Sequence, residues 1–190
     1  IGLVIEPIGT IHQTSGNFNN HIGLPLTLLP MPKQADALVL EMGMNHAGEI
    51  ALLQDIGDPN IRIITNVGAA HLEGLGSIEA IAAAKGELFD GARPGDICCI
   101  NMDDAFVSIL PLPSGVKIIR YGSTEHCDVQ LVDAQVDPIT LHTHFTVKTA
   151  TETARGTIPN PGIHMAHNAI GAIAVGLALN LPLGPMIEQI

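Results

Sequence analysis

Positive charge is scarce in this 190-residue chain, which carries eight Lys and Arg residues against 19 Asp and Glu, a formal charge of -11. Nucleic-acid grooves and proteins that bind anionic membranes need clustered cations, so we expect neither kind of partner. No apolar run approaches the roughly 20 residues of a membrane span, and no basic segment leads into an apolar signal core. These absences favour a cytoplasmic protein that is not inserted in a membrane.

Cysteine is also rare, with three residues, two of which are adjacent in the segment GDICCIN at 95–101. This segment resembles a strand, in which neighbouring side chains point to opposite faces of the sheet. An odd number of cysteines without C-x-x-C spacing argues against a disulfide framework and a zinc site. We therefore expect buried free thiols.

The hydrophobic content of 46% is enough for a sizeable core, and one domain spanning residues 1–190 is the simplest organisation. Short apolar runs alternate with helical patterns in the first hundred residues, which is typical of a parallel α/β sheet. The expected strands are 37–43, 61–68 and 95–102, and the expected helices are 47–56 and 77–90.

The pattern changes at Lys117, after which apolar and polar residues alternate as in antiparallel hairpins with one solvated face. The segments concerned are 117–123, 128–137, 139–149 and 152–159. A helix from Met165 to about Asn180 follows. The predicted fold is α/β: a mostly parallel sheet flanked by helices, with an additional antiparallel β portion in the C-terminal half.

Glu41 ends the apolar run at 37–40 in the first expected strand, and His71 comes shortly after the strand expected at 61–68. Ligands of open parallel sheets gather at the carboxyl ends of the strands, so both residues should face one crevice. A carboxylate after an apolar strand needs a cation to offset its desolvation, either a ligand or a Lys or Arg side chain. His71 is equally compatible with a packing or capping role.

Lys85 lies on the apolar stripe of the helix at 77–90, together with Ile81 and Leu88. Such a lysine either extends past the helix edge to solvent or serves in chemistry, because burial lowers its pKa and frees the neutral amine. Glu41, His71 and Lys85 on successive α/β units suggest a phosphate and metal site.

The segment TSGNFNN, residues 14–20, places three asparagines at one bend. Asparagine side chains often bond to their own loop, which is one interpretation. The other is that the amides donate to and accept from a ligand.

Four segments together resemble the central domain of the Mur ligases, over about residues 9–185. They are TSGNFNNHIGLPLTLL, LEMGMNHAGEI, ITNVGAAHLEGLGSIEAIAAAKGELFDG and PGIHMAHNAIGAIAV. The similarity is greatest to the branch that joins D-alanyl-D-alanine to a UDP-N-acetylmuramoyl-tripeptide in peptidoglycan synthesis. The resemblance implies an ATP-dependent ligase that works through an acyl phosphate and uses Mg²⁺.

The resemblance also implies roles for individual residues. Glu41 and His71 would be metal ligands, and Lys85 would be carbamylated by CO₂ and hold a second metal; these three would be the catalytic residues. Asn168 would bind adenine. The candidates for substrate binding are Thr14, Asn17, Asn19, Asn20, Asn45 and His46.

Two departures from the family pattern qualify this prediction. The chain has no Gly-Lys pair and so no phosphate-binding loop, and we expect it to begin after that loop, to end before the C-terminal domain and to be inactive alone. Met165 stands where the family motif G-x-H-N-x-x-N-A has its first Asn. Alternative functions are a folylpolyglutamate or cyanophycin synthetase-like ligase, and a non-catalytic binding module with the same fold.

Overall fold

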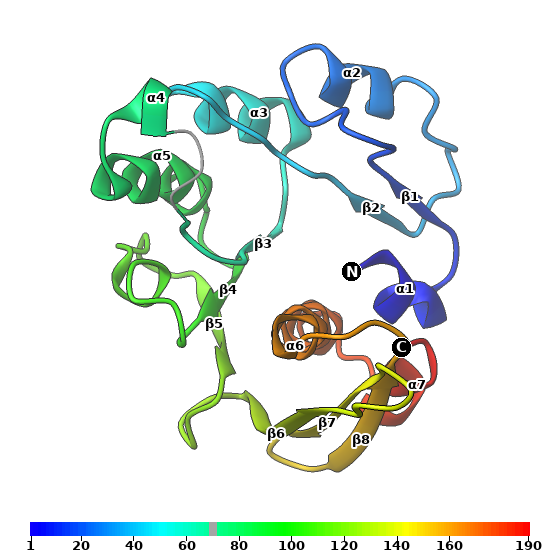
Figure 1. The fold of residues 1–190 in the computed structure, drawn as a ribbon. Coiled ribbons are helices and arrows are strands. Elements are labelled where there is room, and N and C mark those ends of the chain that lie inside the picture. Colours follow the sequence, from blue (N-terminus) through cyan, green and yellow to red (C-terminus); the bar gives the residue numbers. More distant parts are fainter. Residues whose placement is uncertain (69–71) are drawn as a thin grey trace.

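The computed structural model describes residues 1–68 and 72–190, which form two sheets with helices on both faces (Figure 1). The small sheet pairs β1 (Ile11–Gln13) with β2 (Ala37–Val39) in parallel. The large sheet has six strands in sequence order. They are β3 (Ile61–Ile64), β4 (Ile97–Asn101), β5 (Lys117–Gly122), β6 (Val129–Val136), β7 (Thr143–Lys148) and β8 (Thr153–Ile158).

Helices lie on both faces of the large sheet at its β3 and β4 end. The central helix α6 (Ile163–Ala178) packs against β3 to β7, whereas α5 (Ile78–Asp90) packs on the other face with α3 (Glu49–Gly57). The side chain of Ser77 caps α5 by accepting a hydrogen bond from the Ala80 amide at 3.2 Å. The remaining helices are short: α1 (Gly2–Ile5), η1 (Glu6–Ile8), α2 (Gly23–Leu28), α4 (Leu72–Leu75), η2 (Val107–Ile109) and α7 (Leu183–Glu188).

The predicted α/β class is confirmed, with one correction to the strand directions. Strand β5 runs parallel to β4 and to β6, so the antiparallel portion begins with β6 rather than at Lys117. A parallel neighbour requires a crossover connection. Here the crossover is the largely irregular segment 102–116, whose only helix is the three-residue η2, so the sequence showed no helical period between the two strands.

The adjacent cysteines lie on opposite faces of β4, as their positions in a strand predicted. Cys98 packs in the core beneath α3 and α5, and Cys99 packs in the core around α6. Both are free thiols with no exposed surface. Among the described residues no helix is long and apolar enough to cross a membrane.

We expect a thiol reagent to modify Cys127 in the native chain and to reach Cys98 and Cys99 only after unfolding. Burial raises the pKa of Cys98 to about 11 and that of Cys99 to about 12, so the reactive thiolate is scarce at both. Cys127 is only half-buried. Mass spectrometry after brief alkylation measures this, and Cys127→Ser should abolish native labelling. Rapid native modification of Cys98 would contradict the closed core.

Candidate functional site

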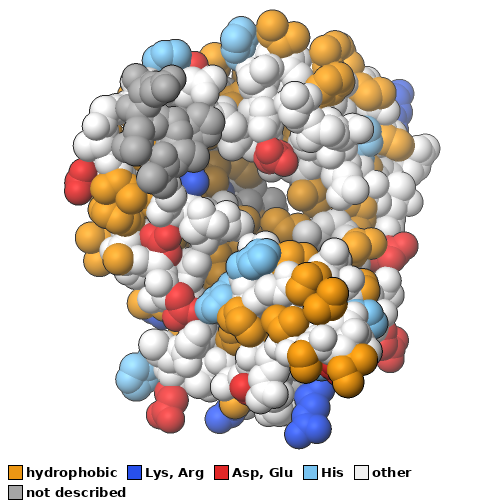
Figure 2. Space-filling model, in the orientation of Figure 1, with side chains coloured by type: hydrophobic (Ala, Val, Ile, Leu, Met, Phe, Trp, Pro, Cys, Tyr) orange, Lys and Arg blue, Asp and Glu red, His pale blue; other side chains and the backbone are white. Residues whose placement is uncertain are grey.

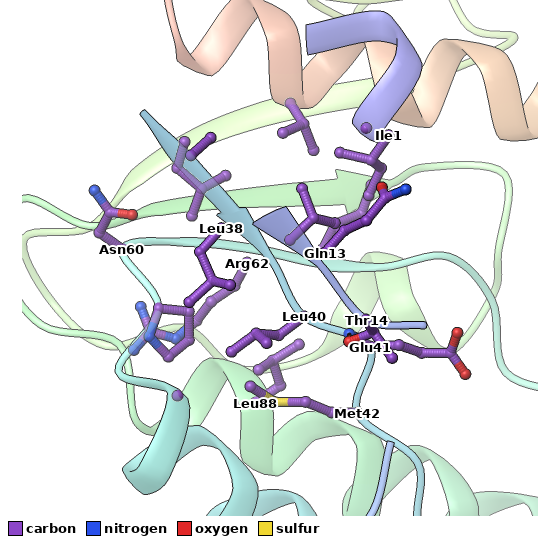
Figure 3. Close-up of a pocket in the computed structure, with 18 of the residues that line it drawn as sticks. Ile1, Gln13, Thr14, Leu38, Leu40, Glu41, Met42, Asn60, Arg62 and Leu88 are labelled. Atoms are coloured by element: carbon purple, nitrogen blue, oxygen red, sulfur yellow. Dashed lines mark hydrogen bonds between the residues drawn. The ribbon is translucent and has the colours of Figure 1, made fainter. Parts of the chain in front are cut away.

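A cleft of about 670 Å³ separates β2 from β3 (Figure 3). Neither strand has another strand on its cleft side among the described residues, so the two sheets do not join. Side chains of α1 and α6 line one wall, and side chains of α3 and α5 line the other. The space-filling view shows the molecule hollowed near its centre, with hydrophobic side chains around the opening (Figure 2).

Glu41, Thr14, Thr65 and Lys85 line the cleft where β2 and β3 end. In Figure 3 Glu41 and Thr14 lie together beyond Leu40, away from the end marked by Asn60. The carboxyl ends of the two edge strands therefore bring a carboxylate and an amine to one opening, as the position of ligand sites in open parallel sheets predicts.

Glu41 is held by the asparagine-rich loop rather than by a cation. Its backbone N–H donates to Thr14 Oγ1 at 2.9 Å, and its Oε1 accepts from Asn19 Nδ2 at 2.7 Å. The residue is exposed, so desolvation does not demand a cationic partner, and no Lys or Arg pairs with it in the described part of the chain. Thr14 and Asn19, predicted as substrate contacts, are thus bonded to the predicted metal ligand.

Gly43 makes room for this arrangement. A Cβ at position 43 would lie 2.9 Å from the amide carbon and nitrogen of Asn19. The Gly43 N–H also donates to the Asn19 backbone oxygen at 2.7 Å. The glycine in the segment EMGMN therefore leaves the space that the Asn19 amide needs in order to donate to Glu41.

Three of the predicted substrate residues, Asn19, Asn20 and Asn45, line a second hollow of about 260 Å³ beside the first. Asn20 Oδ1 is already engaged, because it accepts from the amides of Ile22 and Gly23 at the start of α2 at 3.0 and 2.9 Å. Asn17 is exposed and lines neither hollow.

Asn45 and His46 form the entry to α3 with Glu49. The Glu49 carboxylate accepts from the Asn45 amide at 2.6 Å and from the His46 amide at 3.2 Å, and it lies 3.1 Å from His46 Nδ1. These bonds lower the pKa of Glu49, and the bond from the Asn45 amide has the largest effect. His46 is exposed and lines neither hollow, and its described contacts are those of a residue at the entry of a helix.

Lys85 is half-buried on α5, and its amine reaches back to the large sheet. Nζ donates to the backbone oxygen of Asn66 at 2.6 Å. Burial lowers the pKa of Lys85, and the negative charge of Asp104 opposes the shift with a smaller effect. The neutral amine is therefore more accessible at Lys85 than on a fully exposed lysine. His71, the third residue of the predicted site, lies outside the described residues.

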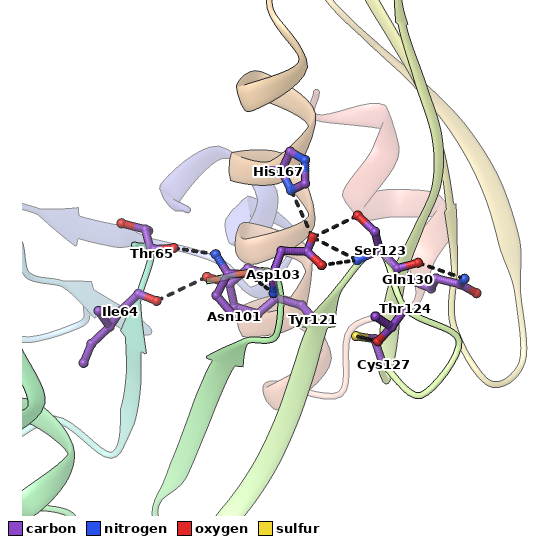
Figure 4. A network of polar contacts seen from close by, with 10 residues as sticks. All are labelled: Ile64, Thr65, Asn101, Asp103, Tyr121, Ser123, Thr124, Cys127, Gln130 and His167. Atoms are coloured by element: carbon purple, nitrogen blue, oxygen red, sulfur yellow. Dashed lines mark hydrogen bonds and ion pairs between the residues drawn. The ribbon is translucent and has the colours of Figure 1, made fainter. Parts of the chain in front are cut away.

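A polar network joins the ends of β4 and β5 to the start of α6 (Figure 4). The Asp103 carboxylate accepts from the Ser123 amide and hydroxyl at 2.9 Å and lies 3.3 Å from His167 Nδ1. Gly122 permits this approach, because it has φ +154° and a Cβ there would lie 2.9 Å from Asp103 Oδ1. Asn168, the predicted adenine contact, is exposed beside His167 and lines neither hollow.

Comparison with known proteins shows to which family the chain belongs, which the geometry alone does not show. The family model described as the Mur ligase middle domain matches residues 2–176. The chain belongs to this family.

Two similar relatives of known name are ligases of the same kind. The UDP-N-acetylmuramoyl-tripeptide--D-alanyl-D-alanine ligase of Bacillus subtilis is 42% identical over 166 residues, 87% of this chain and 35% of that protein. The ligase of the same name from Escherichia coli is 34% identical over 183 residues, 95% and 40% of the two chains. The chain thus spans well under half the length of these relatives.

Solved structures agree. A crystal structure of MurF from Acinetobacter baumannii superposes with a TM-score of 0.91 at 28% identity, covering 99% of this chain and 41% of the other. A MurF ligase from Thermotoga maritima, solved in complex with ADP, gives a TM-score of 0.83 at 24% identity over 98% of this chain and 44% of the other, a likeness of fold.

The middle domain also contains polar residues that the sequence analysis missed. Asn101 is the last residue of β4, and Asp103 and Asp104 follow the strand, as Glu41 follows β2. The segment NMDD carried the same signal, polar side chains at the carboxyl end of an apolar strand. Their partners, Ser123 and the backbone at 65–67, could not be read from the sequence because they are distant along the chain.

We expect Gly43→Ala to destabilise the chain by about 1–3 kcal/mol, because the added methyl displaces the Asn19 amide from its place against Glu41. Urea denaturation measures the loss. Gly184→Ala is the matched control, since nothing lies within 4 Å of a Cβ there, and it should cost nothing. In an Asn19→Ala background the cost of Gly43→Ala should shrink. An undiminished cost would refute the coupling of Gly43 to Asn19.

Proposed function

We propose that this chain is the central part of an ATP-dependent ligase that joins D-alanyl-D-alanine to a UDP-N-acetylmuramoyl-tripeptide in cytoplasmic peptidoglycan synthesis. The observation that carries the proposal is that Glu41 and Lys85 line one cleft at the ends of β2 and β3. The names of the relatives at 42% and 34% identity support the choice of substrates.

The proposed reaction has two steps. A carboxylate of the tripeptide attacks the γ-phosphorus of ATP, forming an acyl phosphate and releasing ADP. The amine of D-alanyl-D-alanine then attacks the acyl carbon, and the tetrahedral intermediate expels phosphate as the amide bond forms. Negative charge gathers on oxygen atoms in both steps, so a site for this chemistry must offer cations or hydrogen-bond donors.

Glu41 suits a Mg²⁺ ion of the kind that one or two carboxylates and substrate phosphates hold. Its Oε1 is oriented by Asn19, and the residue is exposed at the cleft opening. Among the described residues no three His, Cys, Asp or Glu side chains cluster as a closed metal site, which fits an ion shared with a substrate. When bound, Mg²⁺ would neutralise charge on the phosphates, and we propose His71 as a further ligand.

We propose that Lys85 is carbamylated in the active ligase and contributes the resulting carboxylate to a second metal. Its half-buried position and lowered pKa favour the neutral amine that reacts with CO₂. The neighbouring positive charge of a metal would stabilise the anionic product. Lys85 thus acts as an anionic metal ligand rather than as a cation.

The remaining candidate residues are assigned to the nucleotide-sugar substrate and to ATP. We propose Asn17, Asn20, Asn45 and His46 as contacts for the nucleotide-sugar substrate, and Thr14 and Asn19 as the pair that orients Glu41 beside it. Asn168 is proposed to bind the adenine of ATP, next to the His167–Asp103 pair.

We further propose that residues 1–190 are inactive alone and that a strand from the same longer polypeptide fills the cleft between β2 and β3. The strands that flank the cleft are parallel to their partners and mostly apolar, and helices cover both walls, as around a buried strand of a parallel sheet. The phosphate-binding loop would follow that strand at the carboxyl end, between Glu41 and Lys85.

Lys85→Arg in the full-length ligase should abolish amide-bond formation while preserving the melting temperature, because arginine keeps the charge and stem but cannot form the carbamate. The wild-type enzyme should lose activity in CO₂-depleted buffer and regain it on addition of bicarbonate. Release of phosphate in the presence of both substrates measures turnover. Full activity of Lys85→Arg, with no response of the wild type to CO₂, would rule out the proposed role of Lys85.

A further inference from the structure

Side chains hold the backbone of four consecutive residues, from Ile64 at the end of β3 to Val67. Strand β3 ends at Ile64, so the peptide groups of residues 65–67 have no sheet partners of their own. Side chains from α5, from β5 and from the end of β4 replace them. The bonds are Tyr121 Oη to Ile64 O at 3.4 Å, Asn101 Nδ2 to Thr65 O at 2.7 Å, Lys85 Nζ to Asn66 O at 2.6 Å, and Val67 N to Asp104 Oδ2 at 2.8 Å.

The side chains that make these bonds are themselves fixed. Asn101 is 8% exposed, and its Oδ1 accepts from the Asp103 amide at 3.0 Å. Asp104 Oδ1 accepts from the amides of Phe106 and Val107 at 3.0 and 2.8 Å. The Val67 N–H belongs to the same peptide group as the Asn66 carbonyl, so its bond to Asp104 holds that carbonyl directly, and the bond from Asn101 to Thr65 O holds the preceding peptide group.

We propose that the Asn66 carbonyl oxygen orients carbamylated Lys85, and that Asn101 and Asp104 are the positioning residues that hold this carbonyl in place. The inference rests on the proposed carbamylation of Lys85. It adds the group that selects one orientation of the modified side chain, together with the residues on which that orientation depends.

The chemistry of the modification supports this assignment. The neutral Nζ of Lys85 attacks the carbon of CO₂, a nitrogen–carbon bond forms, one carbon–oxygen π bond becomes an oxyanion, and one amine proton passes to solvent. The product keeps a single N–H. Lys85 Nζ lies 2.6 Å from Asn66 O, so that N–H has an acceptor in place. With it bonded there, the planar carbamate has one orientation, and its carboxylate points away from Asn66.

The charge of Asp104 and its hydrogen bond to Val67 predict opposite effects of its removal on the carbamylation of Lys85, which allows a test. If Asp104 affected Lys85 through its charge alone, its removal would favour the neutral amine and increase carbamylation. If Asp104 acts by holding Val67, its removal should decrease carbamylation. Asp104→Asn separates the two, because its single oxygen cannot serve both Val67 and the amides of Phe106 and Val107.

The experiment measures the carbamate by ¹³C NMR of the full-length ligase equilibrated with ¹³C-bicarbonate, with Lys85→Arg identifying the signal. We expect Asp104→Asn and the uncharged Asn101→Leu each to reduce the carbamate signal about 3- to 10-fold, in keeping with loss of one hydrogen bond. Asp103→Asn is the matched control. It alters the adjacent carboxylate, which bonds Ser123 and His167 rather than residues 65–67, and should leave the signal unchanged.

Each outcome decides the inference. A signal in Asp104→Asn equal to or above that of the wild type overturns it, as does an equal reduction in Asp103→Asn. If Asn101→Leu does not fold, Tyr121→Phe removes a bond to Ile64 without changing charge or shape, and a smaller reduction is expected. Absence of the signal from the wild type overturns both the modification and this inference, while product formation by the same sample still tests the ligase reaction separately.

Discussion

The candidate site lies across a gap between the two sheets, where β2 and β3 have no described strand to pair with on their cleft sides. Alternate residues of a parallel strand bond to one neighbour and then to the other, and Leu38 of β2 and Ile63 of β3 direct their N–H and C=O groups into the cleft. Open edges of this kind inside an apolar cleft are costly, since buried backbone groups require partners. A parallel strand at about 4.8 Å from each neighbour would supply them.

Each half of the site has its own hydrogen bonds. On the small-sheet side, Asn19 and Thr14 hold Glu41, and Gly43 leaves room for the Asn19 amide. On the large-sheet side, the backbone oxygen of Asn66 accepts a bond from Lys85. No described hydrogen bond or ion pair links Glu41 to Lys85, so the carboxylate and the amine are positioned separately, one from each sheet.

Sequence patterns predicted those features that depend on local alternation. The opposite faces of Cys98 and Cys99 and the inward position of Lys85 follow directly from strand and helix periods. Features that depend on distant partners were not predictable in this way. The parallel direction of β5 depends on an irregular crossover, and the role of Asp104 depends on Val67, 37 residues earlier in the chain.

Hydrogen exchange at the amides of Leu38 and Ile63 tests most directly whether a strand joins the two sheets. Followed by NMR, both amides should exchange rapidly in the 190-residue chain and slowly in the full-length protein, where the strand would accept their hydrogen bonds. The Val39 amide, which faces β1, is the internal reference and should be protected in both. Rapid exchange of Leu38 and Ile63 in the full-length protein would contradict a strand between the two sheets.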